Sequence, residues 1–185
     1  WNFHRYSPGL VGGHCIPVDP YYMTYASSEL GYDARVVLAG RDMNERMAEF
    51  IADKISELIR SVTGVQAKAS VLLLGLAFKP NVSDLRNSKV MALANLLLER
   101  DLILDVYDPF VQHRLPDGID YRMLENPFSS NKEYDAVILA VPHDIFMDQK
   151  NRIVELVNPG GLVVDLASGL NQSDVESLGK IYWSL

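Results

Sequence analysis

The fold is decided by residues 70–86, which read SVLLLGLAFKPNVSDLR. The first part is an apolar run that is typical of a strand buried on both faces, as the strands of parallel sheets are. Gly75 is followed by bulky residues, whereas a dinucleotide-binding turn has the pattern G-x-G-x-x-G. A standard NAD site is therefore not expected at this turn. Lys79 and Arg86 bracket it instead; they either meet an anionic ligand or are two solvated surface charges.

Similar apolar runs recur downstream as LILDVYD (102–108), YDAVILAV (134–141) and GLVVDLA (161–167). Between the first two strands, residues 87–101 have helical spacing, with Asn87 or Ser88 as the cap. A second crossover helix is predicted over 145–157. This alternation predicts an α/β fold with a doubly wound, mainly parallel sheet, which is Rossmann-like without G-x-G-x-x-G and binds ligands at the carboxyl ends of its strands.

The residues before this sheet divide into two regions. Residues 1–19 are rich in glycine and proline and are predicted to form an ordered loop. Residues 20–63 are helical in pattern, with a first helix that opens at Pro20 and a long helix over 34–62. The apolar stripe of the long helix fits core packing, a connector between domains or a subunit contact. The predicted organisation is thus a loop, a helical region and a sheet domain over 64–185.

Composition excludes several classes of protein. The net charge of −7 argues against a nucleic-acid partner, because phosphate contacts favour clustered Lys and Arg. No apolar run reaches the ~20 residues that span a bilayer, so no membrane segment is predicted. One cysteine cannot form an internal disulfide, which favours a reducing cytoplasm. The chain begins at Trp1 and reaches a glycine-rich motif almost at once, which indicates a fragment of a longer protein.

That motif, PGLVGGHCIPVDPYY at 8–22, contains the single cysteine, Cys15. Gly12 and Gly13 allow positive φ or a close approach of the backbone to a ligand. Neighbouring side chains of an extended segment point to opposite sides, so a catalytic pair of His14 and Cys15 is not expected. The residues alone leave a reactive thiol and an inert buried cysteine equally open.

Four motifs together carry a resemblance: residues 8–22, LAGRDMNERM (38–47), GLAFKPNVSDLR (75–86) and VYDP (106–109). The chain resembles the UDP-glucose/GDP-mannose dehydrogenase family. It is most similar to the branch that oxidises UDP-N-acetylhexosamines (GlcNAc, GalNAc or ManNAc) to uronic acids for surface polysaccharides such as capsules. The sequence GGHC, where UDP-glucose enzymes often have GGSC, favours that branch over a UDP-glucose or GDP-mannose dehydrogenase.

The resemblance implies an N-terminal NAD-binding domain that this chain lacks, a homodimer built through the central helix and a C-terminal domain for the UDP-sugar substrate. The chain by itself is then expected to be inactive, so a non-catalytic module that binds UDP-sugar and dimerises is the alternative. Lone Gly75 argues against a third possibility, an independent classical NAD protein.

The resemblance also implies roles for particular residues. Cys15 is the nucleophile that holds the aldehyde, and Asp19 organises water and proton transfers. Arg86 reaches the pyrophosphate of NAD, oriented by Asp84. No metal is implied. The substrate-binding residues are Arg5, Tyr6, Gly12, Gly13, Phe78 and Lys79.

Two further polar residues receive structural interpretations. Asn44 is expected to make a hydrogen bond at a helix crossing, and His143 is expected to be a surface-loop histidine. Many relatives carry an arginine after the strand that matches 161–167, where this chain has Ala167 and Ser168.

Overall fold

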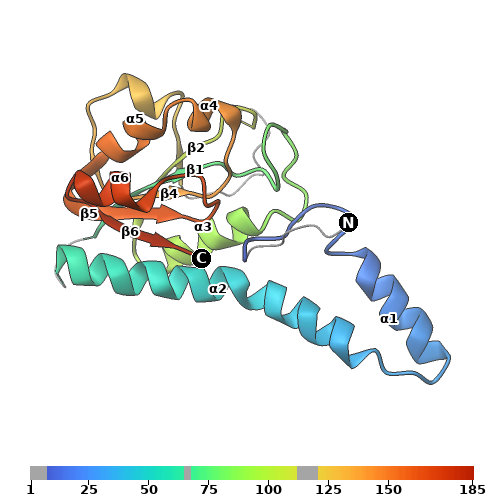
Figure 1. Cartoon of the computed structure of the whole chain (residues 1–185). Coiled ribbons are helices and arrows are strands. Elements are labelled where there is room, and N and C mark those ends of the chain that lie inside the picture. Colours follow the sequence, from blue (N-terminus) through green and yellow to red (C-terminus); the bar gives the residue numbers. More distant parts are fainter. Residues whose placement is uncertain (1–7, 65–67, 112–120) are drawn as a thin grey trace.

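The computed structural model describes residues 8–64, 68–111 and 121–185, and it confirms the predicted α/β fold. Six strands form one sheet in the order β3-β2-β1-β4-β5-β6, and every neighbouring pair is parallel (Figure 1). Both edge strands, β3 and β6, were not predicted. The strands are β1 (Ser70–Leu74), β2 (Ile103–Tyr107), β3 (Arg122–Met123), β4 (Tyr134–Leu139), β5 (Val157–Asp165) and β6 (Ile181–Ser184).

Helices cover both faces of the sheet. Alternate residues of the central strands form two core clusters, one against α2 and α3 and the other against α4, α5 and α6. This explains why the strands are apolar throughout rather than on one side only. The helices are α1 (Asp19–Glu29), α2 (Arg35–Thr63), α3 (Lys89–Glu99), α4 (Asp144–Met147), α5 (Lys150–Glu155) and α6 (Gln172–Ser177), with a 3-10 turn at Pro127–Ser129.

The long helix α2 has two roles along its length. Its second half packs on the sheet through Ile51, Ile55 and Ile59, which are at most 3% exposed. Full burial of such a side chain contributes roughly 1.5–3 kcal/mol. Its first half projects from the sheet beside α1 (Figure 1), and here Met43 of the apolar stripe is more than half exposed, as is Phe50 just beyond this half. We call residues 19–47, which contain α1 and the start of α2, the arm.

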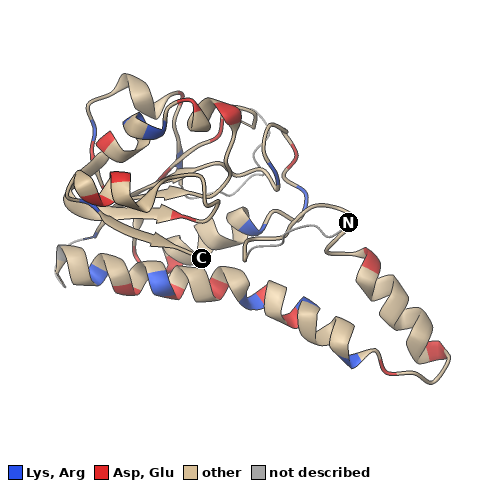
Figure 2. Cartoon of the chain, in the orientation of Figure 1, with Lys and Arg blue, Asp and Glu red and all other residues tan. Residues whose placement is uncertain are grey.

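Charged residues of both signs alternate along α2 (Figure 2). Arg41 pairs with Glu45 at 3.0 Å and Arg46 pairs with Asp42 at 2.8 Å, both at i,i+4 spacing. Such pairs support a helix by ~0.2–0.5 kcal/mol each, which helps the half that the sheet does not cover. No helix within the described residues combines the length and apolar character that a bilayer crossing requires.

Two local predictions need correction. The crossover predicted over 145–157 is two short helices, α4 and α5, separated at Asp148 and Gln149. Ser88 does occupy the N-cap position of α3, but its hydroxyl donates to the carbonyl of Leu76 at 2.6 Å rather than capping the helix. The start of α3 is thereby tied to the residues that directly follow β1.

A buried carboxylate joins three strands on the sheet. Asp105 of β2 accepts two hydrogen bonds from the guanidinium of Arg122, one from Lys132 at 2.7 Å and one from the hydroxyl of Tyr134 at 2.7 Å. Burial opposes ionisation, but these donors outweigh it and lower the pKa of Asp105 to about 2. Asp105 is therefore ionised at neutral pH.

Candidate functional site

The connections reverse direction at β1. The chain passes from β1 to β2 on one side, while β4 pairs with β1 on the other, so the topological switch point lies between β1 and β4. Parallel α/β sheets bind ligands in the crevice at the carboxyl side of this point. Residues 75–86 leave β1 there, and we call them the β1 turn. Its ends meet where the Phe78 N–H donates to the Asp84 carbonyl at 3.2 Å.

Gly75, the first residue of the β1 turn, has φ +89°. A Cβ at this position would lie 2.5 Å from Cβ of Val141, so glycine is required by packing against the loop after β4. The space beside Gly75 is filled by protein rather than open to a pyrophosphate. The turn therefore does not fit a classical dinucleotide cradle, in agreement with the sequence.

A buried aspartate holds the β1 turn in place. Asp108, directly after β2, accepts hydrogen bonds from the N–H groups of Leu76 at 2.7 Å and Ala77 at 3.1 Å, and from that of Phe110 at 2.8 Å. Nε2 of His143 lies 3.2 Å from the same carboxylate. Burial opposes ionisation of Asp108, but these hydrogen bonds outweigh it and lower its pKa.

The prediction that His143 is a surface-loop residue is wrong, because its side chain is fully buried. Its Nδ1 accepts a hydrogen bond from the N–H of Asn81 at 2.9 Å, so in this arrangement the proton is on Nε2 and is donated to Asp108. Asn81 in turn accepts from the N–H of Asp144 through its side chain. His143 thus links the tip of the β1 turn to the loop after β4.

The loop that carries the cysteine, residues 8–18, docks on the far end of the β1 turn; we call it the cysteine loop. The N–H of Gly13 donates to the carbonyl of Arg86 at 3.2 Å, and the amide of Asn87 donates to the carbonyl of Gly13 at 3.0 Å. Asn44 of α2 donates to the carbonyl of Val11 at 3.1 Å, so its side chain does make a structural hydrogen bond, but to the cysteine loop rather than at the predicted helix crossing.

Both predicted glycines lie where the cysteine loop touches the β1 turn. A Cβ on Gly12 would lie 2.6 Å from the carbonyl oxygen of Asn87. Gly13 has φ +100°, and a Cβ on it would lie 3.0 Å from the ring of Phe78. In the described structure these glycines therefore permit loop-to-turn contact, while their predicted role in binding substrate stays a prediction.

The prediction that His14 and Cys15 point to opposite sides is wrong. Nδ1 of His14 lies 2.9 Å from Sγ of Cys15. The reason is that the backbone is not extended here: it bends over residues 13–15, so side chains of neighbouring residues need not point to opposite sides. A turn follows directly, in which the N–H groups of Val18 and Asp19 both donate to the carbonyl of Cys15. Cys15 is exposed, which removes the alternative of an inert buried thiol.

Charged and aromatic side chains cluster next to His14, the neighbour of the thiol. The ring of His14 meets that of Phe78 edge to face at a centroid distance of 6.3 Å, and Nζ of Lys79 lies 5.5 Å from the Phe78 centroid. Arg86 binds Asp84 at 2.6 Å, as predicted, and this pairing lowers the pKa of Asp84 to about 2. The pKa of Arg86 is raised by Asp84 and further by the charge of Cys15.

The remaining predicted site residues are Asp19, Arg5 and Tyr6. Asp19 is the first residue of α1, and its backbone N–H donates to the carbonyl of Cys15 at 2.8 Å. Its carboxylate is close in sequence to the thiol, but its catalytic role stays a prediction. Arg5 and Tyr6 lie outside the described residues. Within residues 8–64, 68–111 and 121–185, no group of three His, Cys, Asp or Glu side chains forms a metal site.

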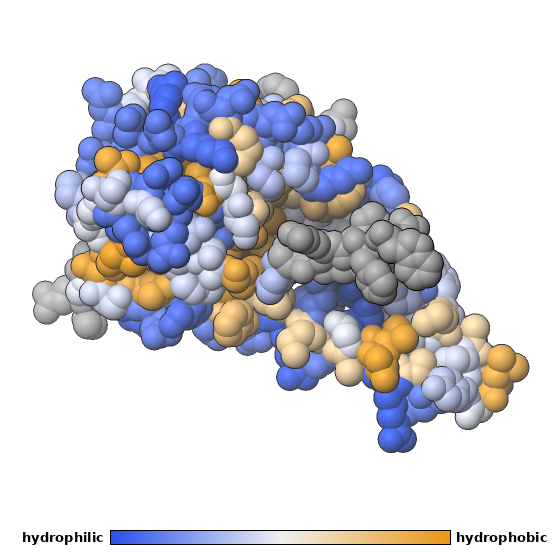
Figure 3. Space-filling model, viewed as in Figure 1, coloured by the Kyte–Doolittle hydropathy of each residue, from blue (hydrophilic) through white to orange (hydrophobic). Residues whose placement is uncertain are grey.

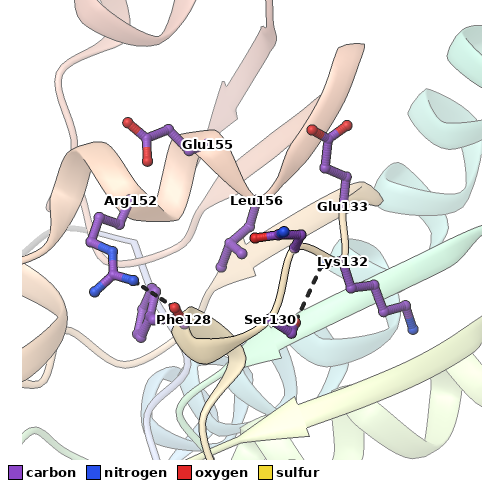
Figure 4. A pocket seen from close by; sticks show the side chains of 8 residues that line it. Phe128, Ser130, Lys132, Glu133, Arg152, Glu155 and Leu156 are labelled. Atoms are coloured by element: carbon purple, nitrogen blue, oxygen red, sulfur yellow. Dashed lines mark hydrogen bonds between the residues drawn. The ribbon is translucent and has the colours of Figure 1, made fainter.

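A cavity of about 290 Å³ lies elsewhere (Figure 4). Most of its lining residues lead into the amino ends of β4 and β5, so it lies away from the β1 turn and the thiol. Arg152 closes one side by donating to the carbonyl of Phe128 at 2.5 Å, and Glu155 and Glu133 are at its rim (Figure 4). The lining holds two carboxylates and two cations, Lys132 and Arg152, so the cavity has no excess of positive charge that would attract an anionic nucleotide.

Comparison with known proteins matches the chain to two family models. The model described as the UDP-glucose/GDP-mannose dehydrogenase family, UDP binding domain, matches residues 72–172. The central-domain model of the same family matches residues 1–46. The first match contains the β1 turn and the second contains the cysteine loop.

Individual relatives agree with these matches. Protein CapL of Staphylococcus aureus is 40% identical over 192 residues, which cover 100% of this chain and 43% of CapL. A UDP-N-acetyl-D-glucosamine 6-dehydrogenase of Pseudomonas aeruginosa is 41% identical over 79% of this chain and 34% of its own length. The solved structure of UDP-D-ManNAc dehydrogenase from Pyrococcus horikoshii has the same fold, with a TM-score of 0.77 at 24% identity over 99% of this chain and 40% of that one. The chain spans less than half of each.

Proposed function

Since the chain belongs to the UDP-glucose/GDP-mannose dehydrogenase family, we propose that it is the C-terminal portion of an NAD-dependent UDP-N-acetylhexosamine 6-dehydrogenase. The whole protein oxidises the C6 alcohol of the sugar to a carboxylate in the cytoplasm, for the synthesis of a surface polysaccharide. This portion supplies the nucleophile and holds the nucleotide end of the substrate, whereas the dinucleotide-binding domain lies outside residues 1–185.

One observation carries the proposal. The exposed thiol of Cys15 lies on a loop that is hydrogen-bonded to the β1 turn, and this turn lies at the topological switch point of the sheet. A parallel sheet places its ligand at this point, so the Phe78–Lys79 corner can contact the nucleotide-sugar while the thiol faces the sugar. Lys79 is exposed, and its ammonium is free to approach a phosphate. The arrangement therefore pairs an anion-binding corner with a nucleophile.

A thiol suits a two-step oxidation. Once the alcohol has become an aldehyde, Sγ of Cys15 adds to C6, and the thiohemiacetal that forms keeps the aldehyde bound and presents a second C–H for hydride loss. Hydrolysis of the resulting thioester by water releases the uronate, with Asp19 organising the water. NAD supplies the hydride acceptor when bound. In this chain only Arg86, 64% exposed beside the thiol, is assigned to its pyrophosphate.

Two features favour an N-acetylhexosamine over glucose or mannose, and a third connects the chain with a surface polysaccharide. The motif at Gly12–Cys15 is GGHC rather than GGSC. The chain is 41% identical to an enzyme named for UDP-N-acetyl-D-glucosamine. It is also 40% identical to CapL, whose name connects it with a capsule. UDP-GlcNAc is therefore the first substrate to test, with UDP-glucose and GDP-mannose as the competing choices.

The test uses the complete protein with its dinucleotide-binding domain. UDP-GlcNAc should yield two NADH per sugar, and Cys15→Ser should abolish uronate formation by blocking the second oxidation. Ser177→Ala is the matched control, since Ser177 is an exposed serine on α6 and should leave the rate unchanged. A Cys15→Ser protein that released uronate at the normal rate would refute the role of the thiol.

A second candidate function concerns the chain by itself, as a module that binds UDP-sugar and dimerises without catalysis. The arm supports it, because hydrophobic surface gathers over it (Figure 3) and both Leu30 and Val36 are nearly 90% exposed. Several apolar side chains that are this exposed and lie on one surface indicate an interaction site. The others on the arm are Tyr21, Tyr22, Met23, Tyr25, Tyr32, Leu38 and Met43.

Sedimentation separates the two aspects of this module. We expect the 185-residue chain to sediment as a dimer and Val36→Asp to shift it toward the monomer, because a buried unpaired charge opposes association. Asp174→Asn, on exposed residues of α6 away from the arm, should leave the dimer intact. Calorimetry with UDP measures binding independently. Hydride transfer by the isolated chain would contradict the module.

A further inference from the structure

The closest polar neighbour of the thiol is an imidazole. Nδ1 of His14 lies 2.9 Å from Sγ of Cys15, within the reach of a hydrogen bond to sulfur. The backbone bends over residues 13–15, and a turn follows in which the N–H groups of Val18 and Asp19 bind the carbonyl of Cys15. The ring of His14 also rests edge to face against Phe78. Backbone geometry and a ring contact therefore both favour this position of the imidazole.

The contact has a definite chemical direction. A neutral imidazole with its proton on Nε2 presents a lone pair at Nδ1, which can accept the proton of the thiol. A thiolate is the nucleophilic form of cysteine, whereas an unassisted thiol is only a few per cent ionised at pH 7. A proton acceptor at this distance is what such a thiol requires.

We propose that His14 is a catalytic residue that takes the proton of Cys15 when the thiol attacks. The proposal rests on the proposed function for the identity of the aldehyde. As the Sγ–C6 bond forms, the Sγ–H proton moves to Nδ1 and the C=O electron pair moves to oxygen. The imidazolium then returns the proton to that oxygen, so the net reaction adds S–H across C=O and requires no other reactant.

The charges around the pair support the transient imidazolium. Asp84 is ionised and close enough to His14 for the two to interact electrostatically, so its carboxylate stabilises a positive ring. The guanidinium of Arg86 interacts electrostatically with Cys15 and would also favour the thiolate. The guanidinium is thus the competing explanation for a reactive thiol. The experiment must separate a proton acceptor from a neighbouring positive charge.

Alkylation of Cys15 by iodoacetamide separates them, with the modified site located by peptide mass spectrometry. His14→Asn retains a hydrogen-bonding group near the Nδ1 position but cannot take up a proton, and His14→Ala removes both. We expect both variants to react about tenfold more slowly than the wild type at pH 7. At pH 10, where an ordinary thiol is largely ionised, all three should react at similar rates.

The outcomes are distinct. Equal rates at pH 7 for wild type and His14→Asn would overturn the proposal, as would a loss confined to Arg86→Gln. A slower rate at pH 10 as well would also overturn it, because it would indicate lost access rather than lost proton transfer. In the complete protein, His14→Asn should slow uronate formation while the first oxidation keeps its rate. Calorimetry with UDP tests the proposed function separately. A chain that binds no UDP but still shows the His14 effect would refute the proposed function and leave the role of His14 intact.

Discussion

Asp108→Asn should destabilise the chain by about 3–5 kcal/mol and weaken UDP binding. The carboxylate accepts four hydrogen bonds: three converge on Oδ2, from Leu76, Ala77 and His143, and Oδ1 accepts from Phe110. An amide placed with its oxygen at the Oδ2 position directs its NH₂ group at the N–H of Phe110. One donor then loses its partner, which costs about 1 kcal/mol at this partly buried position. The other three bonds lose the strengthening that a charged acceptor gives, about 1 kcal/mol each.

Urea unfolding, followed by tryptophan fluorescence, measures this cost, and calorimetry with UDP measures the functional consequence. Asp148→Asn is the matched control: Asp148 is exposed at the end of α4 and should change stability by less than ~0.5 kcal/mol. A cost below ~1 kcal/mol for Asp108→Asn would refute the reasoning, since it would mean that the four bonds do not hold the turn. Reduced stability with unchanged UDP affinity would instead show that the β1 turn does not contribute to UDP binding.

The remaining predictions concern the cysteine loop and the loss of folding stability at low pH. Gly13→Ala should cost about 1–3 kcal/mol more than Gly31→Ala in urea unfolding: both residues have positive φ, but only at Gly13 would the added Cβ meet the ring of Phe78. Equal costs would show that the contact is unimportant. The pKa of Asp105 is lowered to about 2 in the folded chain, so its contribution is complete above pH ~4 and is lost as the pH falls toward 2. Between pH 4 and pH 2, wild type should therefore lose on the order of 2 kcal/mol more stability than Asp105→Asn, and parallel urea curves would contradict this.

The elements that the sequence predicts well are those with local causes. The long helix was expected over 34–62 and lies at Arg35–Thr63, because an apolar stripe and Gly64 define it within its own residues. The four central strands follow from apolar runs in the same way. The crossover over 145–157 failed because the helix is interrupted at Asp148 and Gln149, where neither a glycine nor a proline marks the end of α4 in the sequence.

The site residues that were missed depend on partners far away in the chain. His143 is buried because it meets Asp108, 35 residues earlier, and Asn81, 62 residues earlier. No local pattern reveals such pairings, although VYDP was recognised as a motif without a role for its aspartate. The contact of His14 with Cys15 was missed for a different reason: an extended backbone was assumed, whereas the carbonyl of Cys15 closes a turn.

The attachment of the cysteine loop to the β1 turn has a consequence for substrate choice. Two hydrogen bonds connect the two segments, one from Gly13 to Arg86 and one from Asn87 to Gly13. Each of them involves a main-chain atom on at least one side. The span from the sulfur to the Phe78 corner is consequently set by the skeleton of the chain and resists adjustment by side-chain substitution. Under the proposed function, this span fixes the distance between the diphosphate of the substrate and C6. Preference for one hexosamine over another must then come from groups that contact the ring substituents, since that distance is the same for all of them.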